Sequence, residues 1–329
     1  KGASQVVDVI GFNYRTDQMA AYHKEFPDKP IIGSETGSTV ATRGEYSNDK
    51  ARHTLRAYDT EHPWWASTAE SWWNITANSP YIAGGFIWTG FDYRGEPTPY
   101  PQWPSVSSYF GVLDLCGFPK DNYWYYRAWW QPNKPLVHLL PHWTWPGRNG
   151  KAIEVWAHSN CEEVELWVNG RSLGRKKVER NRHVAWSVPY APGNIEARGF
   201  NAGKRVASDV RKTTGTAYAV NLIADRRRVQ ADGRDVAMLR AEIVDKSGNI
   251  VPHGDAKIRF TVSGPARIIG VGNGNPTCVE PEQASERSAF NGLCQAIVQT
   301  KPSMGTIKIT AQADGLKAGS VTLVSLPAV

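Results

Sequence analysis

The uneven distribution of tryptophan and a change of sequence pattern near residue 135 constrain the fold most. Eleven of the 14 tryptophans lie at or before Trp145, and none follows Trp186. Before residue 135, apolar segments alternate with segments of helical pattern, which is typical of βα units around a parallel sheet. After it, short alternating strands follow one another without helices, as in β-sandwiches. The sequence therefore predicts an α/β segment over 1–135 and two β-sandwich modules over 136–215 and 216–329.

Apolar segments and turn signals predict the individual elements. In the first part we expect strands at 6–12, 30–33 and 82–88, and helices at about 48–58, 64–74 and 123–130. The Pro at 63 separates the first two helices, because proline interrupts a helix. Beyond residue 136, alternation predicts strands at 153–157, 164–168, 236–244, 257–262 and 306–311. Asn169-Gly170 after the second of these is a strong hairpin signal.

Charge and composition exclude several classes of protein. The formal net charge is +7, but residues 1–135 carry 12 basic and 14 acidic side chains. Because nucleic-acid binding needs basic and stacking residues on one surface, this tryptophan-rich part does not fit it. We interpret the basic cluster after residue 174 as a solvated strand edge; it comprises Arg175, Lys176, Lys177, Arg180 and Arg182. No run approaches the roughly 18 apolar residues of a membrane span, and the N-terminal residues lack a signal-peptide pattern.

One apolar segment delivers a single carboxylate at its carboxyl end. Ile31-Ile32-Gly33-Ser34 leads directly to Glu35. Barrel enzymes place their reacting groups at such strand ends, where the strand fixes position and the loop admits substrate. Glu35 is therefore a candidate catalytic residue. Alternatively, it caps the next helix or pairs with an arginine.

Two aromatic residues follow or end the neighbouring strands. Tyr14 follows the first predicted strand, and Trp88 ends the third. In a parallel sheet the Tyr14 hydroxyl would lie near the Glu35 carboxylate, where a donated hydrogen bond orients the carboxylate. The Trp88 indole would give a flat wall for a sugar ring. Alternatively, Tyr14 covers the rim of the barrel, and Trp88 is a core residue.

Four segments resemble the end of the (β/α)₈ barrel of glycoside hydrolase family 2. These are Asp8–Tyr14, Ile32–Ser38, Gly84–Tyr100 and Ser107–Asp121, and their run most resembles bacterial β-galactosidases. Later segments are similar to the immunoglobulin-like module and the further sandwich that follow this barrel; they are His142–Gly147, Val164–Gly174, Asp232–Asp235 and Gly270–Pro276. The resemblance therefore implies the C-terminal part of a TIM barrel followed by two immunoglobulin-like sandwiches.

The resemblance also implies roles for particular residues. It makes Glu35 the catalytic nucleophile, Tyr14 its hydrogen-bond partner and Trp88 a wall of the subsite for the cleaved sugar. It further predicts a cis peptide bond between Trp88 and Thr89. Asp92 and Trp103 are expected sugar contacts, although each could equally be a residue that supports the site from behind or packs a loop.

The family's second carboxylic acid is missing from the sequence. In this family the general acid/base is a Glu that follows an Asn on the fourth barrel strand, and no Asn-Glu pair occurs in this sequence. We therefore expect this chain alone to be inactive and to need an N-terminal part, or another chain, to complete the barrel. No organic cofactor is expected. Related enzymes can use Mg²⁺ or Na⁺, but no ligands for these ions are identifiable, and the four cysteines form no C-x-x-C pair.

The implied activity is retaining hydrolysis of terminal β-D-galactosides, in a bacterial periplasmic or extracellular setting. A β-glucuronidase or β-mannosidase of the same family is the first alternative. Glucuronidases recognise the uronate through an Asn-x-Lys motif, whereas this chain has Phe118-Pro119-Lys120-Asp121 in the corresponding region. A non-catalytic set of carbohydrate-binding or structural modules is the second alternative. A row of solvent-facing aromatic side chains on a sandwich, drawn from Trp156, Trp167 and Trp186, would favour it.

Overall fold

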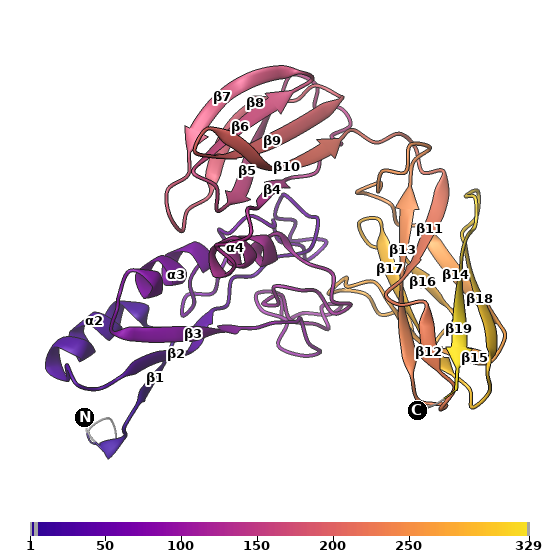
Figure 1. The fold of residues 1–329 in the computed structure, drawn as a ribbon, viewed down its shortest axis with the longest axis horizontal. Coiled ribbons are helices and arrows are strands. Elements are labelled where there is room, and N and C mark those ends of the chain that lie inside the picture. The colour runs from indigo at the N-terminus through magenta and orange to yellow at the C-terminus, as the bar shows by residue number, and fades with distance from the viewer. Residues whose placement is uncertain (1, 3–5, 328–329) are drawn as a thin grey trace. The chain divides into compact units, whose positions relative to one another are not determined.

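A computed structural model of the chain describes residues 2 and 6–327. Contacts divide the chain into two compact units, Lys1–Arg211 and Lys212–Val329. Among the described residues, helices occur in the first unit only, and sheets occur in both (Figure 1). The predicted division of the first unit at residue 135 stays a prediction.

The first unit begins with a small parallel sheet. Its strands are β1 (Ile10–Asn13), β2 (Ile31–Gly37) and β3 (Ile82–Trp88), in the order β1-β2-β3. Helices α2 (Thr16–Glu25) and α3 (Ala69–Ala77) connect them and lie on one side of the sheet (Figure 1). The strand-helix alternation expected for this part is thus present, although helix α2 was not predicted.

Small residues allow this sheet to pack closely. A Cβ atom added at Gly33 would meet the Thr36 methyl group at 2.4 Å, and one at Gly85 would meet the Trp72 ring at 3.0 Å. The Thr36 hydroxyl donates to the carbonyl oxygen of Phe86 at 2.9 Å, which ties the carboxyl half of β2 to β3. The position of the residues at the end of β2 therefore follows from packing on its neighbour.

The predicted helix at 48–58 is wrong. The segment forms a turn closed by a bridge between Asp49 and Thr54. The Asp49 carboxylate accepts from the backbone N–H groups of Ala51 and Arg52 at 2.9 and 3.1 Å, so the side chain stabilises a turn instead of capping a helix. The next helix, α3, begins five residues later than expected, because Thr68 caps it through the N–H of Ser71 at 3.0 Å.

The last helix and the first sandwich follow the prediction. Helix α4 spans Asp121–Trp130. One sheet of the sandwich has the order β4-β5-β8, and the other has the order β10-β9-β6-β7. Their bounds are β4 Val137–Leu140, β5 Ala152–Ser159, β6 Glu163–Val168, β7 Arg171–Lys177, β8 Val184–Pro189, β9 Asn194–Asn201 and β10 Lys204–Lys212. The two sheets enclose one core that includes Trp143, Val155 and Leu166. Strands β6 and β7 form the antiparallel hairpin predicted from Asn169-Gly170.

The second unit is a second two-sheet structure. One sheet has the order β11-β13-β17-β15, and the other has the order β12-β19-β18-β14-β16. Their bounds are β11 Ala219–Ala224, β12 Arg228–Gln230, β13 Val236–Val244, β14 Lys257–Ser263, β15 Ala266–Gly272, β16 Glu286–Ser288, β17 Leu293–Thr300, β18 Gly305–Gln312 and β19 Gly319–Leu326. Alternate residues of β13, β17 and β18 fill a common core, for example Leu239, Ala296 and Ile309. The strands predicted at 236–244, 257–262 and 306–311 are confirmed.

One strand edge carries the basic cluster singled out in the sequence. β7 is an edge strand of its sheet, and its residues Arg175–Lys177 are exposed, as predicted. Arg180 and Arg182 of the same predicted cluster lie instead in the connection to β8, where Arg182 pairs with Glu70 at 2.9 Å. All four cysteines are free thiols. Among the described residues, no helix has the length and apolar character that crossing a membrane requires.

Candidate active site

The carboxyl ends of β1, β2 and β3 bring together three of the predicted site residues. In the parallel register Asn13 lies opposite Glu35, and Gly37 lies opposite Trp88. The backbone N–H of Tyr14 donates to the carbonyl oxygen of Glu35 at 2.7 Å. The chain then turns away at Tyr14, whose φ of 58° lies in the left-handed region. Tyr14, Glu35 and Trp88 therefore lie on one edge of the sheet.

The Tyr14 hydroxyl connects Glu35 to a serine that sequence reasoning missed. Tyr14 interacts with the Glu35 carboxylate, and its hydroxyl lies 2.8 Å from Oγ of Ser38. The same Oγ atom lies 3.2 Å from the carbonyl oxygen of Trp88. Ser38 is 1% exposed. One buried hydroxyl therefore links the residue after β1 to the last residue of β3.

Burial makes the Tyr14 phenol a weaker acid than a free phenol. Burial raises the pKa of the phenol well above its ordinary value of 10, the bond from Ser38 lowers it, and the bond to Glu35 raises it further. The phenol therefore stays protonated at neutral pH. It can donate its proton to a carboxylate, which is the role predicted for it.

Trp88 is fixed by two contacts of its own. Its indole N–H donates to the Tyr93 hydroxyl at 3.0 Å, and the two rings meet edge to face with centroids 5.9 Å apart. Tyr93 in turn donates to the Glu96 carboxylate. The Trp88–Thr89 peptide bond is cis, as predicted. Tyr93 and Glu96 were not among the predicted residues.

The surroundings of Asp92 and Trp103 differ from those of Tyr14, Glu35 and Trp88. Asp92 is 6% exposed; its carboxylate pairs with Lys120 Nζ at 2.7 Å and accepts from the Gly111 N–H at 2.8 Å. Burial raises the pKa of Asp92 to about 6, against the lowering effect of Lys120. These contacts favour the alternative in which Asp92 supports the loops from behind. The Trp103 side chain is 73% exposed and free to contact a ligand.

The described residues offer no ready metal centre. No group of three or more His, Cys, Asp and Glu side chains in that part of the chain is arranged to hold a metal ion. A separate small pocket of about 240 Å³ lies beside Arg182 and His183, and its lining includes Glu70, Asn74 and Ile75.

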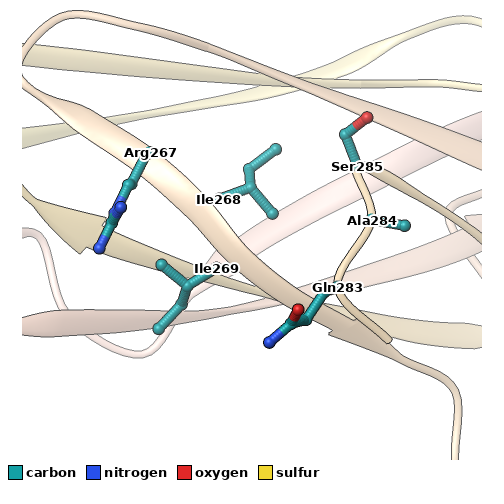
Figure 2. Close-up of a pocket in the computed structure, with 6 residues that line it drawn as sticks. All are labelled: Arg267, Ile268, Ile269, Gln283, Ala284 and Ser285. Carbon is teal, nitrogen blue, oxygen red and sulfur yellow. The ribbon is translucent and has the colours of Figure 1, made fainter. Parts of the chain in front are cut away.

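The second unit has an open pocket of about 390 Å³ beside β15. Figure 2 shows Ile268 and Ile269 on the strand and Gln283, Ala284 and Ser285 on the facing segment. Its charged side chain, Arg267, donates to Gln299 at 2.9 Å. The lining holds neither an aromatic ring nor a carboxylate, so it does not fit the chemistry predicted for this chain.

Comparison with known proteins identifies the family. Residues 220–322 match the model described as glycoside hydrolase family 2 C-terminal domain 5, and residues 150–207 match a domain of unknown function. The chain is 39% identical over 95% of its length to the β-galactosidase BoGH2A of Bacteroides ovatus. It belongs to glycoside hydrolase family 2. The predicted resemblance is thereby confirmed.

Further members of the family differ in their named activities. The chain is 30% identical over 93% of its length to a β-glucuronidase of Formosa agariphila, of which it covers 32%. A crystal structure of a β-glycosidase from Bacteroides vulgatus superposes with a TM-score of 0.90 at 32% identity over 97% of the chain. The chain spans 38% of the Bacteroides ovatus protein and 45% of the Bacteroides vulgatus one. The chain thus spans less than half the length of each of these two relatives.

Proposed function

We propose that this chain supplies the nucleophile of a retaining glycoside hydrolase that removes terminal β-D-galactose. The position of Glu35 beside Tyr14 and Trp88 at the carboxyl edge of the parallel sheet carries the proposal. Retaining enzymes need a carboxylate that attacks the anomeric carbon and a second carboxyl group about 5 to 5.5 Å away. The 39% identity to a protein named β-galactosidase supports the choice of sugar.

The proposed chemistry assigns one step to each of the three residues. A Glu35 oxygen attacks the anomeric carbon while the bond to the leaving oxygen breaks, and water later releases the sugar from the glycosyl-enzyme. Tyr14 donates a hydrogen bond that holds the attacking carboxylate in place. The Trp88 ring forms a wall for the sugar. The proton for the leaving oxygen comes from an acid outside this chain, because the family's Asn-Glu pair does not occur in the sequence.

We propose further that β1, β2 and β3 are the last strands of a (β/α)₈ barrel. Three parallel strands have two open edges, and a barrel closes only when all its strands pair. The apolar side chains of Val9 and Phe86, which are 52% and 66% exposed, would be covered by the rest of the barrel. An N-terminal part of the protein, or another chain, would supply those strands. The sandwiches that follow would be its immunoglobulin-like modules.

A β-glucuronidase is the second candidate, because relatives from Formosa agariphila and Bacteroides fragilis carry that name. Lys120 lies where the uronate-binding motif would fall. It is 3% exposed and donates to the carbonyl oxygens of Ala41 and Tyr109 at 2.8 and 3.0 Å, in addition to its pair with Asp92. A lysine with three internal contacts is poorly placed to bind a substrate carboxylate, so these contacts favour the galactoside.

The non-catalytic alternative receives less support. Trp156 and Trp186 are 6% and 7% exposed, and the Arg198 guanidinium covers the Trp167 ring at 4.2 Å. Within the described part of both sandwiches no tryptophan is exposed. A solvent-facing row of aromatic rings, which that alternative requires, is therefore missing from this part of the chain.

A panel of nitrophenyl glycosides tests the proposal on the full-length protein. We expect hydrolysis of the β-galactoside, and a loss of at least about a thousandfold in kcat for Glu35→Gln. Asp92→Asn serves as the control for a buried carboxylate outside the reacting centre. Cleavage of the glucuronide but not the galactoside, or an active Glu35→Gln variant, contradicts the proposal.

A further inference from the structure

One buried lysine connects the segments that follow the strands of the candidate active site. Lys120, the residue before α4, is 3% exposed. Its ammonium group donates to the carbonyl oxygens of Ala41 and Tyr109 at 2.8 and 3.0 Å and pairs with Oδ2 of Asp92 at 2.7 Å. Ala41 belongs to the connection after β2, whereas Asp92 and Tyr109 belong to the connection between β3 and α4. One side chain thus joins the segments that follow β2 and β3.

The contacts of Asp92 continue from this lysine to Trp88. Oδ1 of Asp92 accepts from the Ser108 hydroxyl at 3.3 Å. The backbone N–H of Tyr93 donates to Oγ of Ser108 at 3.1 Å, and the Ser108 N–H donates to the Tyr93 carbonyl oxygen at 2.8 Å. The Tyr93 hydroxyl accepts from the Trp88 indole at 3.0 Å. A continuous set of contacts therefore runs from the Lys120 ammonium group to the Trp88 ring.

The two carbonyl contacts reach the same ring through an apolar cluster. The Ala41 N–H donates to the carbonyl oxygen of Tyr109 at 3.1 Å, so this oxygen accepts from both Ala41 and Lys120. Val40 and Tyr109 belong to one buried cluster, and Trp88 packs against it. Lys120 therefore fixes the backbone on which the supporting side of this cluster depends.

The ammonium group has no donor left for a substrate. A lysine side chain has three N–H donors, and Lys120 has three acceptors, namely two carbonyl oxygens and one carboxylate oxygen. A buried ion pair is often no more stabilising than apolar side chains of the same volume. Stability alone is thus a weak reason for a lysine at this place, and its effect on the reaction has to pass through its neighbours.

We infer that Lys120 is a positioning residue that holds the Trp88 ring in place relative to the strand of the nucleophile. The inference rests on the proposed function, in which Trp88 is a wall of the sugar site. Such a wall contacts the sugar both before and during the reaction. A displaced ring therefore weakens binding of the substrate and of the transition state alike, which raises KM and changes kcat little.

The variant Lys120→Met of the full-length protein tests the inference with a nitrophenyl β-galactoside. Methionine fills much of the lysine volume without a charge, and Asp92 then stays buried without a cation, so the melting temperature should fall. We expect KM to rise about tenfold and kcat to stay within about twofold of the wild type. A purely structural role gives the opposite split, because loss of folded protein lowers the apparent kcat and leaves KM unchanged.

A matched control removes another buried cation. Arg287 of the second unit is 1% exposed. Arg287→Met should lower the melting temperature as well, but it should leave KM at the wild-type value. A rise in KM with both variants would mean that KM follows general destabilisation, and the inference would be wrong.

A second comparison separates positioning from neutralisation of the Asp92 charge. In the double variant Lys120→Met/Asp92→Asn no buried charge is left unpaired at this place, so the melting temperature should recover. KM should stay about tenfold above that of Asp92→Asn alone, because none of the three contacts of the ammonium group is restored. If KM recovers together with the melting temperature, Lys120 only neutralises Asp92 and the inference is wrong.

The outcomes distinguish this inference from the proposed function. An active wild-type protein whose KM does not respond to Lys120→Met overturns the inference alone. If Lys120→Met abolishes cleavage of a glucuronide and leaves cleavage of the galactoside unchanged, Lys120 binds the substrate directly and is not a positioning residue. If the wild-type protein hydrolyses no glycoside, the proposed function fails and the inference fails with it.

Discussion

The Tyr14 and Ser38 hydroxyl groups can each donate one hydrogen bond, but together they take part in three contacts. Ser38 lies within hydrogen-bond distance of Tyr14 and of the Trp88 carbonyl oxygen, and Tyr14 also contacts Glu35. If Ser38 donates to Trp88, Tyr14 must donate to Ser38, and the carboxylate loses its bond. If Ser38 donates to Tyr14, the Tyr14 proton is directed at Glu35. The 2.8 Å distance between the two hydroxyl groups fits either direction, so the Ser38 proton decides whether Tyr14 donates to Glu35 or to Ser38.

Ser38 is therefore a positioning residue, and Ser38→Gly tests it. Glycine adopts the φ of 58° at this position without strain. The relief of backbone strain therefore offsets the stability that is lost with the Ser38 hydrogen bonds. We expect kcat of the full-length enzyme to fall about five- to tenfold, with KM and the melting temperature little changed.

A double-mutant cycle separates this role from a structural one. If Ser38 acts through Tyr14, adding Ser38→Gly to Tyr14→Phe should cause no further loss of kcat. Equal losses in the wild-type and Tyr14→Phe backgrounds would show that Ser38 does not work through the phenol.

At the scale of single elements, β5 contains an unusual buried histidine. His158 is 1% exposed, and neither ring nitrogen has a hydrogen-bond partner among the described residues. Burial, with smaller contributions from His138 and His183, lowers the pKa of His158 to about 3, and only Asp121 opposes this. The folded protein thus keeps the ring neutral, whereas the unfolded chain protonates it near pH 6.5.

This histidine predicts a loss of stability in mild acid. Between pH 6.5 and 3 the unfolded state binds the extra proton, so the contribution of His158 to stability falls as the pH falls. From pH 7 to pH 5 it costs about 2 kcal/mol. Asp59 and Asp92, whose pKa values burial raises to about 6, act in the opposite direction.

A comparison of unfolding curves isolates the histidine. His158→Phe fills the same space without a titrating group, so the stability difference between this variant and the wild type should change by about 2 kcal/mol between pH 7 and pH 5. Denaturant unfolding at the two pH values measures it. A constant difference would mean that His158 is protonated equally in both states.

At the scale of the whole molecule, local sequence patterns predict some strands and helices and miss others. Alternation predicted β5, β6, β13, β14 and β18, because each of these strands buries about every second side chain. It did not predict β10, β17 or β19, although each of these has eight or nine residues. The helix expected at 48–58 failed because the Asp49 side chain satisfies the backbone of its own turn. Helix α2 was missed because most of its side chains are polar and only Met19 is buried.

The candidate site shows the same limit. Glu35, Tyr14 and Trp88 were predictable, because each lies at or just after the carboxyl end of an apolar strand. Ser38, Tyr93 and Glu96 were not, because their importance comes from contacts that the sequence pattern does not contain. The bond between Ser38 and the Trp88 carbonyl oxygen, for example, spans 50 positions of the chain.

The central claim, that Glu35 forms the glycosyl-enzyme, can be tested by trapping that species on the full-length protein. A 2-deoxy-2-fluoro-β-galactoside with a dinitrophenolate leaving group reacts quickly in the first step and slowly in the second, so the covalent sugar accumulates. Peptide mass spectrometry should then find one fluorosugar on the peptide that contains Glu35. A label on a different carboxylate, or no label on a protein that still hydrolyses galactosides, would contradict the account.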